Sequence, residues 1–270
     1  MRDLFIFGLG YSAQALATLL RAQGWRVTGT TRDGRDGTLR FDDQVAVHTA
    51  LAQASHILSS VPPERAGGDD QVLSHYGDAI RAAPARWVGY LSSAGVYGDT
   101  GGAWVDESAP IGTGRRSARA AADEAWQGLR GDVCVFRLPG IFGPGRSALE
   151  RVREGRAYRV DMPGQVFNRV HVEDIVAGVI ASFAGPPGVY NLADDAPCSQ
   201  NLVIEYAARL LGAPLPSLIA ADDPRIGEQA RAFYTEQRRI STLKAKRLLG
   251  WQPLYPDYKA GLAACLPYIV

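Results

Sequence analysis

The stretch 90-YLSSAGVYGD-99 places two serine hydroxyls, those of Ser92 and Ser93, at the end of an apolar run and just before a turn that contains glycine. A serine hydroxyl both donates and accepts hydrogen bonds, so it can polarise a substrate oxygen when a second group exchanges the proton. The segment that follows, 114-GRRSARAAADEAW-126, contains no tyrosine, histidine or lysine. The sequence therefore raises the question of which residue exchanges a proton alongside these serines.

A second stretch, 8-GLGYSA-13, has the spacing of a phosphate-binding turn. The apolar run 3-DLFIF-7 precedes it, and the segment ALATLLRAQGW after it has leucines at helical spacing and ends near Gly24. The β-branched run 26-RVTGTTR-32 comes next. This order of strand, Gly-rich turn, helix and strand is the context in which the fingerprint binds a dinucleotide.

Each position of this turn has a physical role in that interpretation. Gly8 permits the sharp turn, Gly10 lets a pyrophosphate approach the backbone, and Ala13 is small enough for helix and strand to pack. Tyr11 and Ser12 open the helix, whose free N–H groups and positive dipole end favour phosphate. The alternative is a Gly-rich turn that binds nothing.

The end of the second strand predicts which nicotinamide cofactor is bound. An acidic residue there accepts hydrogen bonds from a ribose 2′-hydroxyl, whereas an arginine pairs with a 2′-phosphate. Here Thr31 and Arg32 occupy these positions and Asp33 follows one step later. This order favours NADP over NAD, although Arg32 beside the flexible 33-DGRDG-37 turn could simply be solvated.

Further strand-like runs at 55-SHILSSV-61, 86-RWVGYLSS-93 and 132-DVCVFRL-138 alternate with segments of helical length. Such alternation predicts an α/β fold with a doubly wound parallel sheet, in which ligands lie beyond the carboxyl ends of the strands. The residues Ser59, Ser60 and Val61 fall at such an end, and we expect them beside the cofactor. After residue 145 the pattern loosens. We therefore predict a Rossmann domain from 1–145 and returning segments of about 166–193, with a small substrate lobe from about 146–165 and 194–270.

Composition excludes several classes of function. The net charge of +1 and pI of about 7.7 give no indication of a nucleic-acid or anionic-membrane partner. Three scattered cysteines do not make a disulfide framework, and the four histidines share no metal-ligand spacing, so we expect no metal site. The start of the chain has no signal-like segment, and the sequence is interpreted as cytoplasmic.

Several motifs together resemble one known family. GLGYSA, LSSAGVYGD, FRLPGIFGPGR, VHVEDIVAGVIAS, GVYNLADD and KAKRLLGWQP occur in the order seen in extended short-chain dehydrogenase/reductases, the NAD-dependent epimerase/dehydratase family. The G-x-G-x-x-A turn and the compact length are more similar to the atypical branch. The resemblance covers nearly the whole chain. It implies a Rossmann domain that holds NAD(P), a C-terminal lobe that holds the substrate, and hydride transfer at a carbonyl or carbinol carbon.

The resemblance identifies Ser93 with the family's catalytic serine, and it also reveals a departure. The family's next element is a tyrosine acid/base followed four residues later by a lysine, and the alignment puts Arg115 and Arg119 at these two sites. No tyrosine occurs between Tyr97 and Tyr158, and no lysine precedes Lys244. An arginine stays protonated and cannot exchange the proton. Arg119 could still hold ribose hydroxyls, and Arg115 could stabilise a developing alkoxide or bind an anionic group; alternatively, both belong to a solvated basic helix face.

Other residues are candidates for the missing acid or for substrate binding. Tyr97 is the nearest tyrosine, although in the family it usually has a structural role. His171 titrates near neutrality, and Tyr234 lies where the lobe could fold over the cofactor. For the substrate, Arg146, Arg169, Arg238 and Arg239 could clamp an anion, or each could be a surface arginine. Phe167 stands where many sugar-nucleotide enzymes carry an arginine.

Two functions remain open at this point. One is an NADP-dependent oxidoreductase or epimerase that acts on a small-molecule substrate of carbonyl or sugar type with a modified site. The other is a non-catalytic NADP(H)-binding sensor whose cofactor state controls a partner. The Ala-rich face of 117-SARAAADEAW-126 would also permit close helix packing in a homodimer, as in family members.

Overall fold

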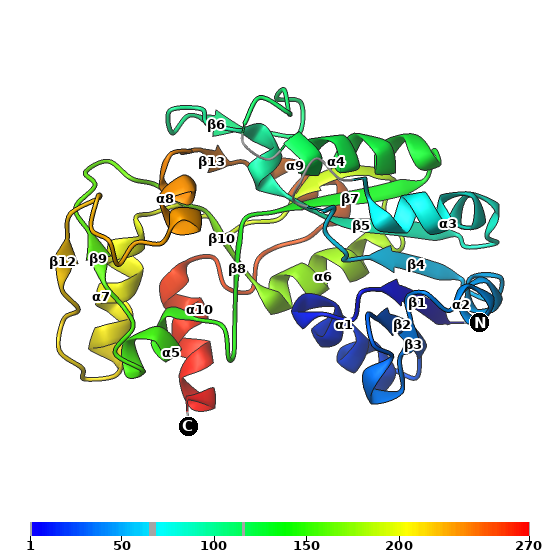
Figure 1. Cartoon of the computed structure of the whole chain (residues 1–270), viewed down its shortest axis with the longest axis horizontal. Helices are drawn as coiled ribbons and strands as arrows, with labels where there is room; N and C mark the ends of the chain where they lie inside the picture. The colour runs from blue at the N-terminus through cyan, green and yellow to red at the C-terminus, as the bar shows by residue number, and fades with distance from the viewer. Residues whose placement is uncertain (1, 65–68, 115–116, 270) are drawn as a thin grey trace.

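The computed structural model describes residues 2–64, 69–114 and 117–269, and within them one large sheet dominates the fold. Its strands are β1 (Asp3–Phe7), β2 (Arg26–Thr31), β3 (Leu39–Arg40), β4 (His56–Ser59), β5 (Trp87–Ser93), β7 (Val133–Leu138) and β11 (Gly188–Asn191). They lie in the order β11–β7–β5–β4–β1–β2–β3, and all neighbours are parallel (Figure 1). The predicted doubly wound α/β fold is thereby confirmed.

Side-chain alternation explains why the sheet is buried on both faces. In β1, Leu4 and Ile6 point into one hydrophobic cluster, whereas Phe5 and Phe7 point into the cluster on the opposite face. All four side chains are at most 1% exposed. Burial of each such side chain contributes about 1.5–3 kcal/mol relative to leaving it in water.

Helices cover the two faces of this sheet (Figure 1). The helices α1 (Tyr11–Ala22), α6 (Val172–Ser182) and α9 (Leu243–Leu249) supply side chains to one cluster. The helices α2 (Gln44–Leu51), α3 (Gln71–Ala82) and α4 (Ser117–Leu129) supply side chains to the other. In α1 the buried positions Ala13, Leu16, Ala17 and Leu20 recur at helical spacing, which turns one stripe of the helix toward the sheet.

A smaller lobe lies beside the carboxyl ends of the strands (Figure 1). Its core joins α5 (Ala148–Arg153), α7 (Gln200–Leu210) and α10 (Tyr258–Cys265), with Leu149, Ile204 and Leu262 almost fully buried. Beside them lie β9 (Arg159–Val160), paired in parallel with β12 (Leu218–Ile219), then α8 (Glu228–Tyr234) and a final 3₁₀ turn, η3 (Leu266–Tyr268).

Two short parallel pairs connect the lobe to the sheet domain. β8 (Gly140–Phe142) pairs with β10 (Arg169–His171), and β6 (Trp104–Val105) pairs with β13 (Arg239–Ile240). The remaining 3₁₀ turns, η1 (Arg35–Gly37) and η2 (Ala94–Tyr97), follow β2 and β5. The β6–β13 pair matters most for function because it brings residues near 236–240 to the loop after β5.

One segment that the sequence assigns to the lobe packs against the sheet domain instead. Ala245 of α9 and Trp251, both assigned to the lobe by sequence, lie in the hydrophobic cluster of the sheet. The indole N–H of Trp251 donates to the backbone carbonyl of Asp174 in α6 at 3.0 Å. The chain therefore crosses back from the lobe to the sheet before it ends in α10.

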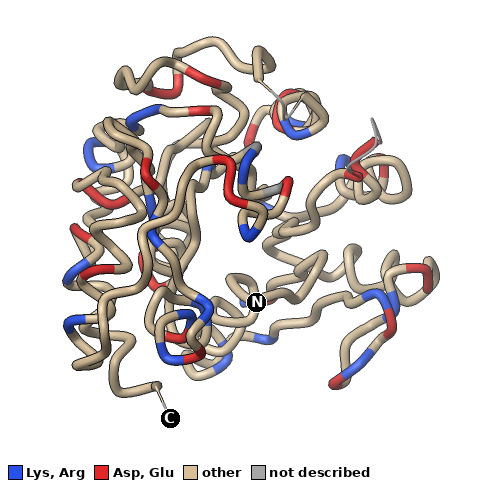
Figure 2. Tube along the Cα trace, turned by 60° about the vertical axis from the view of Figure 1, so that its left-hand side comes forward, with Lys and Arg blue, Asp and Glu red and all other residues tan. Residues whose placement is uncertain are grey.

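Nucleic-acid, membrane or metal binding would depend on the distribution of charge, the lengths of the helices and the grouping of possible metal ligands. Basic and acidic residues are interspersed along the whole trace (Figure 2), in keeping with the net charge of +1. Among the described residues, no helix combines the length and apolarity that crossing a bilayer requires. Nor do three His, Cys, Asp or Glu side chains gather there in a way that could hold a metal ion.

Candidate functional site

The Gly-rich turn lies where the sheet changes its winding direction. Strands β1 and β4 are neighbours although β2 and β3 separate them in sequence, and such a switch point is where open α/β sheets bind ligands. Gly8 has φ +78°, and a Cβ there would lie 2.7 Å from Cγ2 of Val61. Its N–H donates to Thr30 Oγ1 at 3.1 Å, and the Ser60 hydroxyl donates to its carbonyl. Only glycine fits this position.

The amino-terminal end of α1 has room and donors for a phosphate. Gly10 is its N-cap, no side chain caps the helix there, and the first turn carries no acidic residue. A Cβ built on Gly10 would meet nothing within 4 Å, so the space above it is open. Beside the turn, the buried Ser59 Oγ has no hydrogen-bond partner among the described residues. An open cradle, uncapped N–H groups at residues 11–13 and an orphaned hydroxyl fit a dinucleotide.

Just after β2, the Arg32 guanidinium has no carboxylate partner among the described residues. The Thr31 hydroxyl bonds with Thr38 Oγ1 at 2.7 Å and accepts the Gly34 N–H at 2.9 Å, which fixes the loop. Asp33 pairs with Arg35 at 3.5 Å. Arg32 is exposed and forms no ion pair with any described carboxylate. Its guanidinium is therefore available to a 2′-phosphate, whereas Asp33 is engaged with its own loop.

A cavity of about 330 Å³ opens between the end of β5 and the lobe. It brings together Ser93, Arg119, Arg146 and Arg238, four residues predicted from sequence, with others that sequence reasoning did not select. The full lining is Ser92, Ser93, Ala94, Gly95, Arg119, Leu138, Pro139, Gly140, Ile141, Arg146, Val166, Phe167, Asn168, Phe233, Glu236, Arg238 and Ile240.

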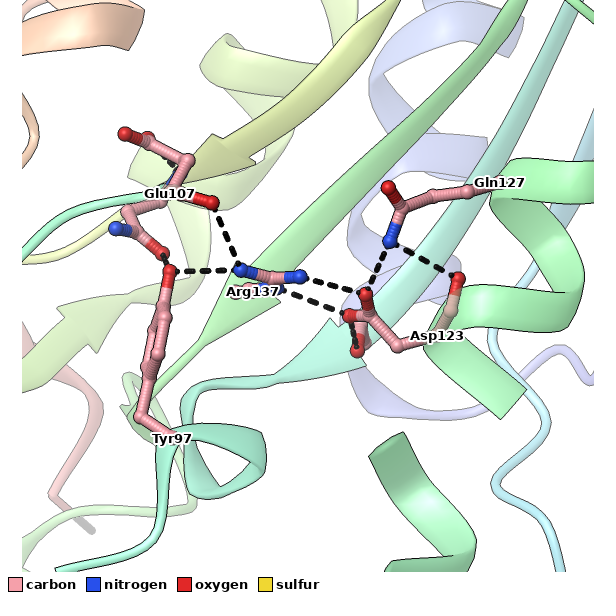
Figure 3. Close-up of polar contacts among 7 residues, drawn as sticks. Tyr97, Glu107, Asp123, Gln127 and Arg137 are labelled. Atoms are coloured by element: carbon pink, nitrogen blue, oxygen red, sulfur yellow. Dashed lines mark hydrogen bonds and ion pairs between the residues drawn. The ribbon is translucent and has the colours of Figure 1, made fainter. Parts of the chain in front are cut away.

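The partner of Ser92 is a carboxylate. Its hydroxyl donates to Asp123 Oδ2 at 2.5 Å, and both residues are buried. Asp123 also accepts from Arg137 Nη2 at 2.8 Å, from Arg137 Nε at 3.1 Å and from Gln127 Nε2 at 2.7 Å (Figure 3). Burial works against the charge of Arg137, but the bonds to Asp123 outweigh it and raise the pKa of the guanidinium. This network holds α4 against the sheet.

Tyr97 belongs to the same network and does not line the cavity. Its hydroxyl donates to Asn191 Oδ1 at 2.8 Å and accepts from Arg137 Nη1 at 3.1 Å (Figure 3). Burial raises the pKa of Tyr97 to about 12 despite the nearby Arg137. The expectation that Tyr97 could exchange a proton with substrate is therefore not supported, because the hydroxyl points into the protein.

The predicted catalytic serine and one arginine do reach the cavity. Ser93 caps η2, and its Oγ accepts the Gly95 N–H at 3.1 Å. Arg119, on α4, donates from Nη1 to the Tyr90 hydroxyl at 3.0 Å. That bond steadies the guanidinium beside Ser93. Arg115, predicted at the tyrosine site, lies outside the described residues.

The lobe contributes an ion pair between Arg238, one of the arginines predicted from sequence, and Glu236, which sequence reasoning missed. Glu236 and Arg238 approach to 2.7 Å, and both side chains are largely buried. Arg238 Nε donates to the Gly98 carbonyl at 2.5 Å. A Cβ built on Gly114 would lie 2.8 Å from Glu236 Oε1, so this carboxylate packs against the residue just before the predicted tyrosine site.

Three other predicted residues lie elsewhere. His171 caps α6 by accepting the Glu173 N–H at Nδ1, it packs against Tyr255, and burial lowers its pKa. Arg169 donates to the carbonyls of Phe167 and Cys198 and to Gln200 Oε1, so it braces the lobe. Tyr234 packs against a small lobe cluster, whereas its neighbour Phe233 faces the cavity. None of the three lines the cavity.

Arg146 stands at the mouth of the cavity. Its guanidinium lies over the Tyr11 ring, 5.5 Å from the centroid, and it forms no ion pair with a described carboxylate. The Tyr11 hydroxyl donates to the Pro144 carbonyl at 3.0 Å. The loop that carries Arg146 is thus attached to the first residue of α1.

Comparison with known proteins gives full-length relatives. Protein YeeZ of Escherichia coli K12 is 31% identical over 95% of this chain and 97% of its own length. A 3-diazoavenalumate denitrifying reductase of Streptomyces is 27% identical over 97% of this chain and 99% of its own. The structure of a functionally unknown conserved protein from Silicibacter pomeroyi DSS is 40% identical, covers 99% of both chains and has a TM-score of 0.87. No family model matches the chain.

Solved structures with lower identity share the fold. MoeE5 in complex with UDP-glucuronic acid and NAD is 20% identical over 98% of both chains, with a TM-score of 0.80. Human epimerase family protein SDR39U1 with NADPH is 18% identical over 98% of this chain and 99% of that one, with a TM-score of 0.79. The sheet order and the Gly-rich turn are those of a Rossmann protein, as in these solved structures. The chain belongs to the same family as protein YeeZ, which it matches at 31% identity over nearly the full length of both chains.

Proposed function

We propose that the chain binds NADP(H) at the turn of residues 8–13 and transfers a hydride to or from a small molecule held in the 330 Å³ cavity. The observation that carries this proposal is the position of the cavity. It lies at the carboxyl end of β5 and combines Ser93, Arg119 and Glu236, three groups that can polarise an oxygen or move its proton. A protein that only reports its cofactor state has no need for such a chamber.

Residues of the sheet domain would hold the cofactor. The N–H groups at the start of α1 would bind the pyrophosphate, Arg32 would pair with the 2′-phosphate, and Ser59 to Val61 would line its path. Arg119 would reach the nicotinamide ribose, as the lysine of the Tyr-x-x-x-Lys pair does in extended short-chain dehydrogenase/reductases, which the sequence resembles. When bound, the cofactor supplies or accepts the hydride. Structures of similar fold contain NAD or NADPH, which supports this assignment.

The proton needs a carrier other than arginine, because arginine stays protonated at every working pH. In the oxidation of an alcohol, Ser93 would hold the substrate oxygen and the Glu236 carboxylate would accept the hydroxyl proton as the hydride leaves carbon. In reduction, the hydride adds to the carbonyl carbon, and the same carboxyl group returns the proton to the oxygen. Arg119 would stabilise the negative charge that develops on that oxygen, and Arg115 remains a second candidate for that role.

The relatives favour redox chemistry over a purely regulatory role. The Streptomyces relative is named as a reductase. The second candidate, a non-catalytic NADP(H) sensor, is favoured by the absence of the Tyr-x-x-x-Lys pair from the sequence. The two candidates agree on cofactor binding and differ in turnover.

The test combines cofactor binding with turnover. Calorimetry measures the binding of NADPH and NADH, and the absorbance of reduced cofactor follows turnover on a panel of aldehydes, ketones and sugar nucleotides. Turnover that falls at least about a hundredfold in Ser93→Ala, but not in the exposed control Ser108→Ala, supports the enzyme. Tight NADPH binding without turnover on any compound supports the sensor, and no binding removes both.

We also propose a homodimer through α3 and α4. A hollow of about 540 Å³ runs between these helices and is lined by Leu73, Ala118, Ala121, Ala122 and Ala125, among others. Small side chains on a helix face let another helix approach closely. Light scattering after size exclusion should give twice the 29.0 kDa chain mass, and Ala121→Glu should give the monomer. A monomeric wild-type protein would contradict this proposal.

A further inference from the structure

Apart from Ser93, which is proposed to hold the reacting oxygen, the neutral polar side chains that line the cavity are already committed to the protein. The Ser92 hydroxyl donates to Asp123 at 2.5 Å. Asn168 donates from Nδ2 to the Arg238 carbonyl at 2.7 Å, and its Oδ1 accepts the Ile240 N–H at 2.9 Å. A polyhydroxylated sugar needs several neutral donors and acceptors to read its hydroxyls. The side chains suited to that task here are used to hold the cavity together.

The charged groups of the lining leave an excess of guanidinium. Arg238 is matched by Glu236 at 2.7 Å. Arg119 and Arg146 also line the cavity, and neither forms an ion pair with a described carboxylate. A guanidinium has donors and no acceptor, and it matches the two oxygens of a carboxylate in a fork. The lining is therefore complementary to an anion.

The rest of the lining is apolar and partly aromatic. Phe167 and Phe233 stack with ring centroids 4.5 Å apart and an interplanar angle of 26°. Val166, Ile141 and Ile240 complete this wall. Flat aromatic walls favour a flat apolar body, which gains stacking and area burial against them.

We propose that the substrate is a small, flat carboxylate whose apolar body lies against Phe167 and Phe233 and whose anionic group pairs with Arg146. This inference rests on the proposed function and names its substrate class. Arg146 is chosen over Arg119 because Arg119 already donates to Tyr90 and stands beside Ser93, where the reacting oxygen would lie. Arg146, at the mouth, would hold the far end of the molecule.

The experiment compares matched pairs of compounds that differ only in charge. For turnover, the pair is para-formylbenzoate and its methyl ester, with UDP-glucose as a third compound. For binding, calorimetry on the NADPH-loaded protein compares benzoate with benzamide. Each measurement uses wild type, Arg146→Met and the control Arg225→Met, whose exposed side chain pairs with Asp223 and does not line the cavity. The affinity for NADPH is measured in all three proteins.

The expected result is a preference for the acid over the ester of about tenfold or more in kcat/KM. Arg146→Met should abolish that preference by lowering the acid's kcat/KM while the NADPH affinity stays within about twofold, and Arg225→Met should behave as wild type. Equal kcat/KM for acid and ester, or a preference for UDP-glucose, would overturn the inference and leave the proposed function intact. An NADPH affinity that falls with Arg146→Met would assign Arg146 to the cofactor instead.

The binding pair decides the inference even if no aldehyde is reduced. Absence of turnover on every compound speaks against the proposed function. In that case benzoate that binds at least about ten times more tightly than benzamide to wild type, and equally weakly to Arg146→Met, still supports an anion site. Equal binding of the two compounds overturns it.

Discussion

Ser92, at the end of β5, donates a hydrogen bond of 2.5 Å to Asp123 of α4, and Asp123 is paired in turn with Arg137 of β7. The hydrogen-bond partner of Ser92 is therefore the buried carboxylate of Asp123, which has a positioning role. It fixes α4, the helix that carries Arg119 to the cavity, against the strand that carries Ser93. The position of Arg119 relative to Ser93 in the cavity therefore depends on an ion pair with side chains only 0% and 4% exposed.

Asp123→Ala should lower the free energy of unfolding by about 3–5 kcal/mol, because it leaves the Arg137 guanidinium buried without its counter-charge. Urea unfolding of wild type and variant measures the difference. The matched control is Asp42→Ala, which removes the carboxylate of the exposed Arg40–Asp42 pair and should change the free energy of unfolding far less, because solvent screens this pair. Similar losses in both variants would show that the buried network does not stabilise the fold.

The sheet domain could be predicted from sequence because its signals are local. In β1 the apolar run, and in α1 the helical spacing of Leu16 and Leu20, each occur within a few residues. The turn at Gly8 and Gly10 combines a backbone requirement with a ligand requirement at adjacent positions. The family motifs extended the same prediction to nearly the whole chain.

The cavity could not be predicted in the same way, because distant segments build it. Glu236 reaches it through the pairing of β13 with β6, two strands of two residues each that lie 135 positions apart in sequence. Phe167 and Phe233 meet across a separation of 66 positions. The segment 233-FYTEQRR-239 gave one signal, a single carboxylate between aromatic residues and arginines, but nothing local indicates where it points.

Gly10→Val should abolish cofactor binding and leave the fold nearly intact. Gly10 has φ −87°, which any residue adopts, and a Cβ there meets no protein atom, so the branched side chain would occupy the space of the pyrophosphate. Calorimetry should show NADPH affinity at least about a hundredfold weaker, with a thermal midpoint close to wild type. Gly8→Ala is the contrasting variant and should destabilise the protein, because Gly8 has φ +78° and its Cβ would clash with Val61. Normal NADPH binding by Gly10→Val would place the cofactor elsewhere.

Arg32→Met should weaken NADPH binding by about 10- to 100-fold and leave NADH binding unchanged, because only NADPH carries the 2′-phosphate. The control is Arg40→Met, an exposed arginine already paired with Asp42. Calorimetry with both cofactors on all three proteins gives the comparison. Equal losses for NADPH and NADH in Arg32→Met would contradict a role in reading the 2′-phosphate.

Glu236→Gln should lower kcat by about 10²–10⁴, the usual contribution of a positioned proton carrier, while NADPH affinity changes little. The melting temperature should fall, because Arg238 loses its buried counter-charge, so kcat is measured well below the melting temperature of the variant. Glu236→Asp should retain part of the activity because it keeps a carboxylate on a shorter arm. Glu228→Gln, at an exposed position of the neighbouring α8, is the control. If Glu236→Gln retained full kcat, the proton would have to travel by another route, and a loss of NADPH affinity equal to the loss of kcat would indicate a structural role.

Asp194 gives the fold a pH dependence that can be isolated by one substitution. Its side chain is buried, one oxygen accepts the Arg169 N–H at 3.4 Å, and the other has no hydrogen-bond partner among the described residues. Burial, partly offset by the Arg169 guanidinium, raises its pKa from 3.8 to about 7. A group whose pKa is raised on folding stabilises the protein fully below its unfolded pKa and less as pH rises through the folded pKa.

Ionisation of Asp194 should therefore lower the free energy of unfolding of wild type by about 4 kcal/mol between pH 4 and pH 7. Asp194→Asn, which cannot ionise, should not show this decrease. His56 acts in the opposite direction, because burial lowers its pKa to about 4 and its contribution is lost as pH falls below 6.5. The informative quantity is thus the difference in unfolding free energy between variant and wild type at each pH, since His56 cancels from it. That difference should grow in favour of Asp194→Asn as pH rises and level off above pH 7, whereas the exposed control Asp42→Asn should show no such trend. A flat difference for Asp194→Asn would mean that Asp194 is ionised in the folded protein throughout this range.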